Sequence, residues 1–555
     1  MERTRRGAPE QVRDETMQRR HWMAVAGALA VALVLRIVYL REIGGHPLYG
    51  ALTGDPALYH QQALDILAGK LVPDHAYFHS SPLYPFVLAG LMRVFTGGLA
   101  AVRAVQAAVG TASVFLIAML ARATLGRRAA VAAAYLAALY VPFIFFESEI
   151  LEITLVIALV TAMLLVLARR GTAARPISAC AAGVLLGLAS LGKPHLLLFA
   201  PVGSVLLFAE RNGPRARRAV QAAAFFLAAG LTILPATIHN YRVSGDLIPV
   251  SSNGGINLFI GNHPGASGMF QVPPEMRLDL LASSTEIAER AEGRALSAGE
   301  VSAYWAGRAL AYMRSSPGPW LRLTARKAAL FWNHYEIPNH YHFYFVREFA
   351  PVLRIPVSTF AVVAPLGLVG LGLAAARRKR RAPLLIAYGA TFMASVVPFF
   401  ITARYRLAIV PVLLVGAGYA LTQVWDWVRA RRWRHLAGAA VALAALGILV
   451  NARMIEFGFA QMHNTVGAIL GSRGDYDGAA VEFGKALEED PANVSARYNL
   501  GMALRETGRL DEAAREFERA VALYPGYGEA RAALAETREA LARAAPADTT
   551  ERRHE

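Results

Sequence analysis

The chain has 555 residues, of which 55% are hydrophobic and only 17% are charged, and its formal net charge is +17 at pH 7. This composition is too apolar for a water-soluble protein of that length and indicates a polytopic membrane protein. The Lys and Arg residues fall in short clusters between apolar runs, so we interpret the charge as a topology signal and expect no nucleic-acid binding. The single cysteine, Cys180, cannot form a disulfide within the chain.

The first predicted element is a membrane helix in the apolar stretch "HWMAVAGALAVALVLRIVYL". It follows a basic tail that contains Arg19 and Arg20, and it is long enough to cross a bilayer at about 1.5 Å per residue. No small-residue cleavage site separates it from "REIGGHP". We therefore expect a retained first span and assign residues 1–21 to a cytoplasmic basic tail.

Further apolar runs bring the expected number of spans to about eleven and define a membrane domain over residues 22–452. The stretch "SPLYPFVLAGLMRVFTGG" either spans or lies in the interface. If it lies flat in the first outer loop, 41–98, every basic cluster between the later spans faces the cytoplasm, as the positive-inside rule requires. We prefer that topology, whose further spans are expected at 99–123, 129–146, 150–168, 176–191, 195–210, 218–236, 354–375, 382–400, 406–424 and 436–451.

This topology places acidic residues from two segments on one outer face. Asp55 lies in the first outer loop, and Glu147, Glu149 and Glu152 lie in "FFESEILEITL", where one span ends and the next begins. Acids at a membrane boundary are costly to desolvate, so a functional role is the default interpretation. The alternative, a loop residue in water, stays open and is strongest for Glu147.

A second outer loop, 237–353, contains a glycine-rich segment and a histidine-rich segment. In "SSNGGINLFIGNHPGASG" no Gly-Lys-Ser/Thr follows the glycines, so we expect flexible turns and no nucleotide loop. In "FWNHYEIPNHYHFYF", His334, Glu336, His340 and His342 offer metal ligands, but their spacing matches no standard metal site. An aromatic belt at the membrane surface is the preferred interpretation, and no metal or other cofactor is expected.

Basic residues at the outer face are candidates for phosphate binding. Arg404, Tyr405 and Arg406 open an outside-to-inside helix in "ITARYRLAIVP", against the positive-inside rule. A phosphate at the headgroup level would explain both arginines, because guanidinium binds phosphate through paired hydrogen bonds; the alternative is snorkelling. Lys193, in "SLGKPHLLLF", is a weaker candidate of the same kind.

Residues 453–545 are predicted to form a tetratricopeptide-repeat solenoid, followed by a disordered tail, 546–555. Gly467 aligns with Gly501 and Phe483 with Phe517, a period of 501 − 467 = 34 residues. Such a stack usually binds a peptide or protein on its concave side, although it can also dock only on its own membrane domain. With the N-terminus inside and an odd number of spans, the repeats emerge on the outer side with Asp55.

Several of these motifs, in this order, resemble the GT-C superfamily of membrane glycosyltransferases. They are Asp55 with Tyr59 and Ala63, "SPLYP", "FESEILE", "LGKP", "NLFIGNHPGASG" and "ARYRL", and they are similar to those of bacterial relatives of protein O-mannosyltransferases and of the lipid A aminoarabinose transferase. The resemblance implies an all-α, GT-C-like membrane bundle with interfacial helices in its first outer loop. Relatives often carry an Asp-Glu pair where this chain has Asp55 followed by Pro56.

The resemblance also implies roles for the candidate residues. Asp55 is the expected catalytic carboxylate, and Glu149 or Glu152 is the second functional acid. The donor would be a polyprenyl-phosphate sugar and the acceptor a hydroxyl on a protein, lipid or glycan, with inversion on the extracytoplasmic face of a bacterial inner membrane. The expected substrate-binding residues are Tyr59, His79, Lys193, Arg404, Tyr405 and Arg406.

Two other classes of protein stay open from the sequence. About eleven spans with charged ends also suit a transporter or a flippase for lipid-linked sugars, although no internal repeat or broken midplane helix is visible in the membrane domain. A membrane-anchored scaffold for the repeats is the other alternative. It leaves Asp55, Glu149, Glu152 and the paired arginines without a role.

Overall fold

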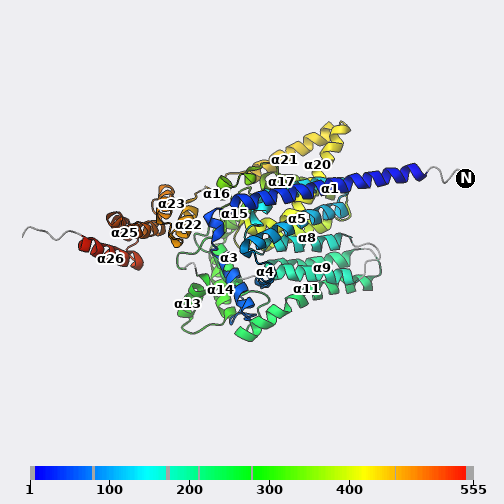
Figure 1. The fold of residues 1–555 in the computed structure, drawn as a ribbon. Coiled ribbons are helices and arrows are strands. Elements are labelled where there is room, and N and C mark those ends of the chain that lie inside the picture. Colours follow the sequence, from blue (N-terminus) through cyan, green and yellow to red (C-terminus); the bar gives the residue numbers. More distant parts are fainter. Residues whose placement is uncertain are drawn as a thin grey trace, which may run out of the picture. The chain divides into compact units, whose positions relative to one another are not determined.

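The computed structural model describes residues 7–77, 82–169, 176–210, 213–276, 279–456 and 458–544. These residues are almost entirely helical, and their only β-pairing is two isolated bridges, Tyr140 with Ser358 and Met269 with Ile401. The predicted all-α fold class is confirmed (Figure 1). The expected tail at 546–555 and the candidate residue His79 lie outside the described residues.

Contacts divide the chain into two compact units. The membrane unit contains Met1–Glu42, Thr53–Phe343 and Ala350–Met454. The repeat unit contains Ile455–Glu555 together with two short segments from earlier in the chain, Ile43–Leu52 and Tyr344–Phe349. Each unit has its own core and is described separately below.

The membrane unit is a bundle of apolar helices, and the chain is a multi-pass membrane protein. Within the described residues, five helices are long and apolar enough to cross a bilayer. They lie in α1 (Gly7–Ile43), α5 (Gly98–Thr124), α11 (Arg215–Ser244), the run α19–η3–α20 (Ala403–Arg406, Leu407–Ile409, Val410–Arg429) and α21 (Trp433–Val450). Shorter apolar helices are α4 (Leu83–Val94), α8 (Ile153–Arg169), α9 (Pro176–Gly192), η1 with α10 (Pro194–Leu198, Phe199–Ala209), α17 (Phe360–Ala376) and α18 (Ala382–Val396). The count of eleven spans stays a prediction.

Two helices differ from, or resolve, the span boundaries that were predicted from the sequence. The expected span at 129–146 is broken into α6 (Arg127–Ala138) and α7 (Val141–Phe146). Tyr140 leaves the helical conformation at ψ 99° just before Val141 and Pro142, and the Val141 N–H donates to the Ser358 carbonyl at 3.2 Å. The ambiguous stretch near 81–98 forms α4, whose 12 residues span about 18 Å, too short for the hydrocarbon core.

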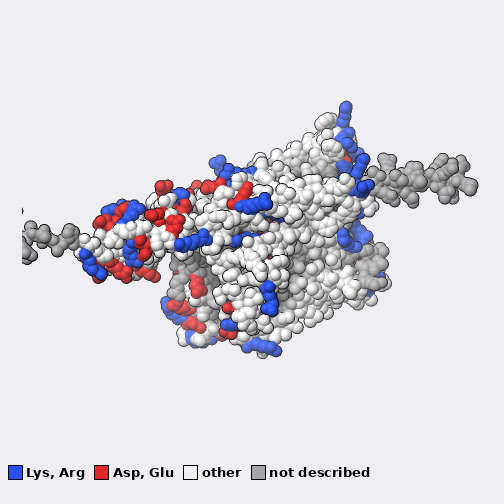
Figure 2. Space-filling view, in the orientation of Figure 1, with Lys and Arg blue, Asp and Glu red and all other residues white. Residues whose placement is uncertain are grey.

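Basic residues gather at one end of the membrane unit. Arg128 pairs with Asp426 at 2.6 Å, Arg377 bonds to Gln423 and Arg381 pairs with Glu210, so the ends of α6, α10, α17 and α20 meet there. In Figure 2, Lys and Arg cluster at the end where α1 begins, next to a largely uncharged surface. This is the distribution that the positive-inside rule predicts for one membrane face.

Small residues allow the helices of the bundle to pack closely. A Cβ on Gly370 of α17 would lie 1.8 Å from the carbonyl oxygen of Gly416 on α20, and one on Gly416 would lie 2.4 Å from the Gly367 carbonyl. Glycine at these positions therefore permits direct backbone contact between the two helices, which is typical of membrane helix interfaces.

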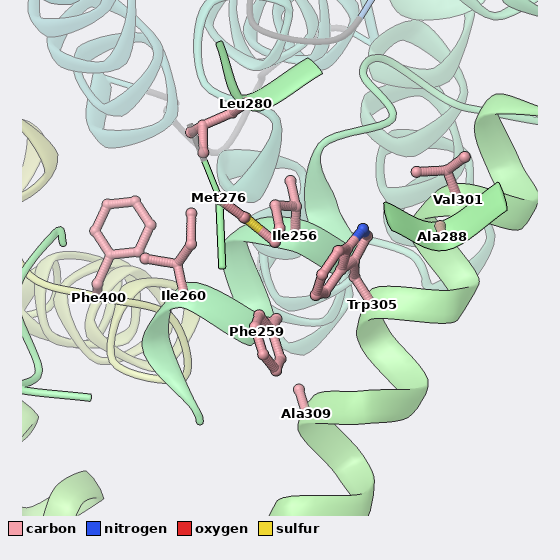
Figure 3. Packing of buried hydrophobic residues seen from close by; sticks show 10 residues of the cluster. All are labelled: Ile256, Phe259, Ile260, Met276, Leu280, Ala288, Val301, Trp305, Ala309 and Phe400. Carbon is pink, nitrogen blue, oxygen red and sulfur yellow. The ribbon is translucent and has the colours of Figure 1, made fainter. Parts of the chain in front are cut away.

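Part of the segment of the second outer loop that was predicted as flexible turns is helical. The prediction was wrong for residues 254–261, whereas residues 262–268 contain turns and bends and no helix. Residues 254–261 form α12 (Gly254–Gly261), because Ile256, Phe259 and Ile260 are buried in one core; Ile256 and Phe259 lie beside Trp305, and Ile260 points toward Phe400 (Figure 3). The Trp305 indole N–H donates to the Ser284 carbonyl at 3.1 Å. The other elements of this loop are α13 (Leu280–Glu292), α14 (Ala298–Ser315), α15 (Pro317–Trp332), α16 (Phe343–Phe349) and η2 (Pro351–Arg354).

The repeat unit confirms the tetratricopeptide prediction. A Cβ on Gly467 would lie 2.7 Å from the Phe483 ring and one on Gly501 would lie 2.6 Å from the Phe517 ring, so the aligned small residues allow each helix pair to cross. The five helices are α22 (Ala460–Ser472), α23 (Tyr476–Glu489), α24 (Val494–Glu506), α25 (Leu510–Leu523) and α26 (Gly528–Ala544), with the short α2 (Pro47–Gly50) packed on α22.

Candidate active site

Asp55 is the first residue of α3 (Asp55–Leu67), a helix of the first outer loop. A carboxylate at this position faces the partial positive charge of the helix N-terminus. The preceding residue, Gly54, has φ +61°, and a Cβ there would lie 2.7 Å from Nδ1 of His340. Glycine therefore provides both the left-handed backbone conformation and the space that the His340 ring occupies.

Asp55 contacts a buried arginine and a histidine. Arg404 Nη1 lies 2.9 Å from Asp55 Oδ2, His340 Nε2 lies 3.1 Å from the same oxygen, and Arg404 Nη1 lies 3.4 Å from His340 Nε2. Burial alone would raise the pKa of Asp55, but the charge of Arg404 and the hydrogen bond with His340 outweigh it and hold that pKa well below its usual range. The side chain of Asp55 is 26% exposed, against 4% for Arg404.

These residues line a cavity of about 530 Å³ in the membrane unit. Its polar wall includes Asp55, Tyr59, Lys193, His340 and Arg404. The rest of the lining is mixed: it contains the polar residues Ser251, Asn253, Asn257, Asn339 and Ser395, and the apolar residues Phe270, Val272, Leu280, Val396, Phe399 and Phe400. Leu280 and Phe400 belong to the core around Trp305, which therefore holds the apolar wall in place (Figure 3).

A second acid–cation pair stands beside the first. Lys193 Nζ lies 2.5 Å from Glu152 Oε1, and both side chains are at least nine-tenths buried. Lys193 Nζ and the Arg404 guanidinium lie 4.4 Å and 5.2 Å from the centre of the Tyr405 ring. Tyr405 thus contacts the cations of both pairs, and each cation has a carboxylate close by.

Glu149 and Glu147 do not line the cavity. Glu149 is 2% exposed, and neither of its carboxylate oxygens has a hydrogen-bond partner among the described residues. Burial raises its pKa to about 8, although Arg103 and Arg404 act in the opposite direction. Glu147 forms a buried pair with Arg36, whose Nη2 donates to Oε1 at 2.7 Å. The backbone of this turn is held by Gln106, which donates to the Glu147 and Glu149 carbonyls.

Arg406 lies away from the cavity. It is 1% exposed, its guanidinium donates to the Asn333 carbonyl and to the Tyr335 carbonyl at 2.8 Å, and its Nη2 lies 3.0 Å from Glu336 Oε2. Its hydrogen bonds and charge are used to hold the 333–336 segment. Arg404 and Arg406 are therefore not equivalent, although the sequence offered them as a pair.

The histidine-rich segment separates into different environments. His334 contacts the Val450 carbonyl at 3.3 Å, and Nε2 of His342 lies 2.8 Å from the Tyr335 hydroxyl. Within the described part of the chain, no three His, Cys, Asp or Glu side chains are grouped as metal ligands. Only His340 of this segment reaches Asp55.

The structure brings together most, but not all, of the predicted site residues. Asp55, Tyr59, Lys193, Arg404 and Tyr405 line one cavity, and Glu152 joins them through Lys193. The sequence interpretation did not select His340 or His195, which line the same cavity. Both are far from Asp55 in the sequence, and no local spacing connects them to it.

Two family models match the chain. Residues 74–239 match the dolichyl-phosphate-mannose-protein mannosyltransferase model, and residues 469–528 match a tetratricopeptide-repeat model. These matches confirm the similarity to GT-C glycosyltransferases with C-terminal repeats. The mannosyltransferase match includes Glu152 and Lys193 and ends before His340 and Arg404.

Solved structures with similar chains include an archaeal oligosaccharyltransferase and ArnT. One is the oligosaccharyltransferase AglB from Archaeoglobus fulgidus, in complex with an inhibitory peptide and a dolichol-phosphate (14% identity, TM-score 0.45, 82% of this chain and 59% of that chain). The other is ArnT from Cupriavidus metallidurans bound to undecaprenyl phosphate (17% identity, TM-score 0.41, 89% of this chain and 79% of that chain). This chain thus spans less than two thirds of the oligosaccharyltransferase.

Proposed function

We propose that the protein is a glycosyltransferase that moves a sugar from a polyprenyl-phosphate donor to an acceptor hydroxyl in the cavity that contains Asp55. The observation that carries the proposal is the placement of Asp55, partly exposed, beside Arg404 in a cavity that is also lined by aromatic and aliphatic side chains. The match of residues 74–239 to mannosyltransferases that use a dolichyl-phosphate sugar supports the same class of donor.

The cavity suits a donor that is both charged and lipidic. Arg404 offers a planar guanidinium that can bind a phosphate through two hydrogen bonds, and Lys193 adds a second cation nearby. The aromatic and aliphatic wall suits apolar atoms next to that phosphate. We infer that the donor phosphate replaces Asp55 as the ion-pair partner of Arg404. The same phosphate also contacts the Lys193 ammonium group.

In the proposed reaction Asp55 is the general base. It removes the proton from the acceptor hydroxyl while that oxygen attacks the anomeric carbon, and the bond from that carbon to the phosphate oxygen breaks on the opposite side. The phosphate keeps the electron pair, and Arg404 and Lys193 stabilise its growing charge. A single displacement inverts the anomeric configuration. Glu152 sets the position of Lys193 and is our candidate for the second acidic role, ahead of Glu149.

The remaining assignments follow the predicted topology. We propose that the basic end of the bundle faces the cytoplasm of a bacterial inner membrane, which puts the N-terminus inside and the cavity at the extracytoplasmic face. In the same topology the repeats emerge on the side of Asp55. There they would bind an acceptor polypeptide or a protein that delivers a protein, lipid or glycan acceptor.

The test is sugar transfer by the purified full-length protein in lipid nanodiscs. Radiolabelled dolichyl- and undecaprenyl-phosphate sugars are supplied, and release of the sugar from the lipid is measured. We expect release by the wild type and by Arg290→Ala, an exposed-arginine control on α13 that pairs with Glu286. We expect little release by Arg404→Ala.

Two outcomes would contradict the proposal. Transport of intact lipid-linked sugar across a proteoliposome bilayer, without release, would favour the flippase class. Equal release by Arg404→Ala and the wild type would show that the reaction does not use this cavity.

A further inference from the structure

His340 occupies a position that the proposed reaction needs and that neither the sequence motifs nor the family match assigns. Its Nε2 atom lies 3.1 Å from an acceptor, Asp55 Oδ2, and 3.4 Å from a donor, Arg404 Nη1. The same nitrogen can therefore accept a hydrogen bond from Arg404 when it is unprotonated and donate one to Asp55 when it is protonated. A side chain that accepts a proton during the reaction must be stable in both of these protonation states.

The contacts of Asp55 leave a place for the acceptor hydroxyl. Both contacts, with Arg404 and with His340, are made by Oδ2. Among the described residues Oδ1 has no partner, so this oxygen is the one available to the acceptor hydroxyl. The proton that Asp55 takes must then leave before the next cycle, and Arg404 cannot receive it because guanidinium is already fully protonated.

We propose that His340 is the second proton acceptor of the transfer and receives through Nε2 the proton that Asp55 takes from the acceptor. This inference rests on the proposed function. Once the donor phosphate has drawn Arg404 away, the Asp55 carboxyl can turn by half a rotation about its terminal torsion, which is a soft, roughly two-fold torsion. The rotation brings the protonated oxygen to His340.

The proposed reaction balances in bonds and in protons. The acceptor oxygen forms its bond to the anomeric carbon, the bond from that carbon to the phosphate oxygen breaks, and the phosphate keeps the electron pair. The acceptor proton moves first to Asp55 and then to His340 Nε2, which restores the carboxylate and forms an imidazolium. His340 then releases the Nε2 proton to water as the products leave, which restores the tautomer that carries its proton on Nδ1 and can accept again at Nε2. Nδ1 has no hydrogen-bond partner among the described residues, and the His340 side chain is 13% exposed.

Gly54 provides an independent structural reason to assign this role to His340. A Cβ on Gly54 would lie 2.7 Å from Nδ1 and 2.8 Å from Cε1 of the His340 ring, so any larger residue would push the ring from Asp55. The charged groups that face the ring are Asp55 from α3 and Arg404 from α19, and Asn339 lies next to it with Nδ2 at 3.5 Å from Nε2.

The test compares pH–rate profiles of the full-length protein in nanodiscs between about pH 5 and 9. His340→Gln keeps a neutral hydrogen-bonding side chain but cannot accept the proton. We expect turnover to fall about 100-fold, the lower range for loss of an acid–base group, and the acid limb that reports an imidazole to disappear. Donor affinity should stay near the wild-type value. His334→Gln, in the same segment but bonded to the Val450 carbonyl, is the matched control and should keep the wild-type profile.

Two further variants separate a chemical role from a structural one. Added imidazole should restore part of the activity of His340→Ala, because it can enter the space left by the ring and accept the proton. Gly54→Ala keeps the imidazole but displaces it, so it should lower turnover without removing the imidazole limb from the profile.

The outcomes distinguish this inference from the proposed function. If the wild type releases sugar and His340→Gln does so at the same rate with the same pH profile, the role of His340 is refuted and the transferase proposal stands. Absence of rescue by imidazole, with a profile that still carries the imidazole limb in His340→Gln, would also refute it. If the wild type releases no sugar from any polyprenyl-phosphate donor, both proposals fall.

Discussion

Replacing Asp55 by Asn should separate donor binding from catalysis. The amide keeps the shape of the carboxylate and can still accept a hydrogen bond from Arg404, but it cannot take a proton and carries no charge. We expect turnover to fall by at least about 100-fold, the usual effect of losing a general base. We also expect donor affinity to rise, because in the structure Asp55 and the donor phosphate compete for Arg404, whose Nη1 lies 2.9 Å from Oδ2.

The size of the affinity change follows from the contact that the phosphate must replace. A hydrogen bond to a charged group contributes about 1.5–3 kcal/mol. The amide of Asn keeps a weaker bond of about 0.5–1.5 kcal/mol, so the donor has roughly 1.4 kcal/mol less to break and its Kd should fall about tenfold.

The assay is binding of a fluorescent polyprenyl-phosphate sugar to full-length protein in nanodiscs, next to single-turnover release. Asp65→Asn, a second acid of α3 that does not line the cavity, is the matched control and should change neither quantity. An unchanged or weaker donor Kd for Asp55→Asn would show that Arg404 is not the phosphate ligand. Near-normal turnover would remove the catalytic assignment of Asp55.

Three further outcomes are expected. Glu149→Gln should be nearly neutral for turnover at pH 7, because the pKa of Glu149, about 8 against an ordinary 4.5, keeps it protonated there. A carboxyl group with a raised pKa stabilises the fold at low pH, and this stability is lost as pH rises toward 8. The difference in melting temperature, variant minus wild type, should therefore increase between about pH 5 and 8. Arg406→Lys should lower the melting temperature and leave the donor KM unchanged, whereas Arg404→Lys should raise that KM. Truncation after Met454 should lower the melting temperature as well as acceptor transfer, and a chain that keeps its full stability would contradict the packing of the repeat unit.

The reason for the last expectation is the composition of the repeat unit. Phe345 lies 5.7 Å from the Phe459 ring and 5.1 Å from the His463 ring, centre to centre, and is 5% exposed. Removal of the repeats would expose it and the segment Tyr344–Phe349. Truncation therefore affects stability as well as acceptor binding. Substitutions of exposed residues of the repeats test acceptor binding without exposing this core.

The sequence selected charged residues of the candidate site, but it did not predict how they are arranged. Asp55 and Arg404 could be selected because a charge at a membrane boundary is costly unless it has a purpose. Their pairing could not, since it depends on how α3 meets α19, and no local pattern encodes that meeting. His340 was missed for the same reason: beside aromatic residues and other histidines it resembled an interfacial belt.

Two features of short motifs could be assigned only from the tertiary structure: which glutamate contacts Lys193, and whether the segment around Ile256 is helical. Glu149 and Glu152 lie in one turn, and only the direction of that turn decides that Glu152 reaches Lys193 while Glu149 is buried without a hydrogen-bond partner among the described residues. The segment around Ile256 was predicted as turns because glycine and asparagine favour them. Burial of Ile256, Phe259 and Ile260 in the core that contains Trp305 and Phe400 overrides that local preference.

The repeats were predictable because their signal is internal to the sequence. A 34-residue period places Gly501 where Gly467 stood one repeat earlier, and each glycine accepts the same phenylalanine contact. Membrane helices are predictable for a similar reason, as hydropathy is read along the chain. The break between α6 and α7 was missed because the run stays apolar through Pro142, and hydropathy does not register the lost backbone hydrogen bond.

The arrangement of charges in the cavity explains how the protein can keep cations ready for a phosphate in an apolar setting. Arg404 and Lys193 would each be costly to bury alone, and each is offset by one carboxylate, Asp55 or Glu152. The two pairs differ in accessibility: Glu152 is 1% exposed and Asp55 26%. In the proposed reaction an incoming phosphate would displace the more accessible carboxylate, and Asp55 would lose the cation that suppresses its basicity when the donor is bound. Donor binding would in this way raise the basicity of Asp55, and deprotonation of an acceptor without a donor present is disfavoured.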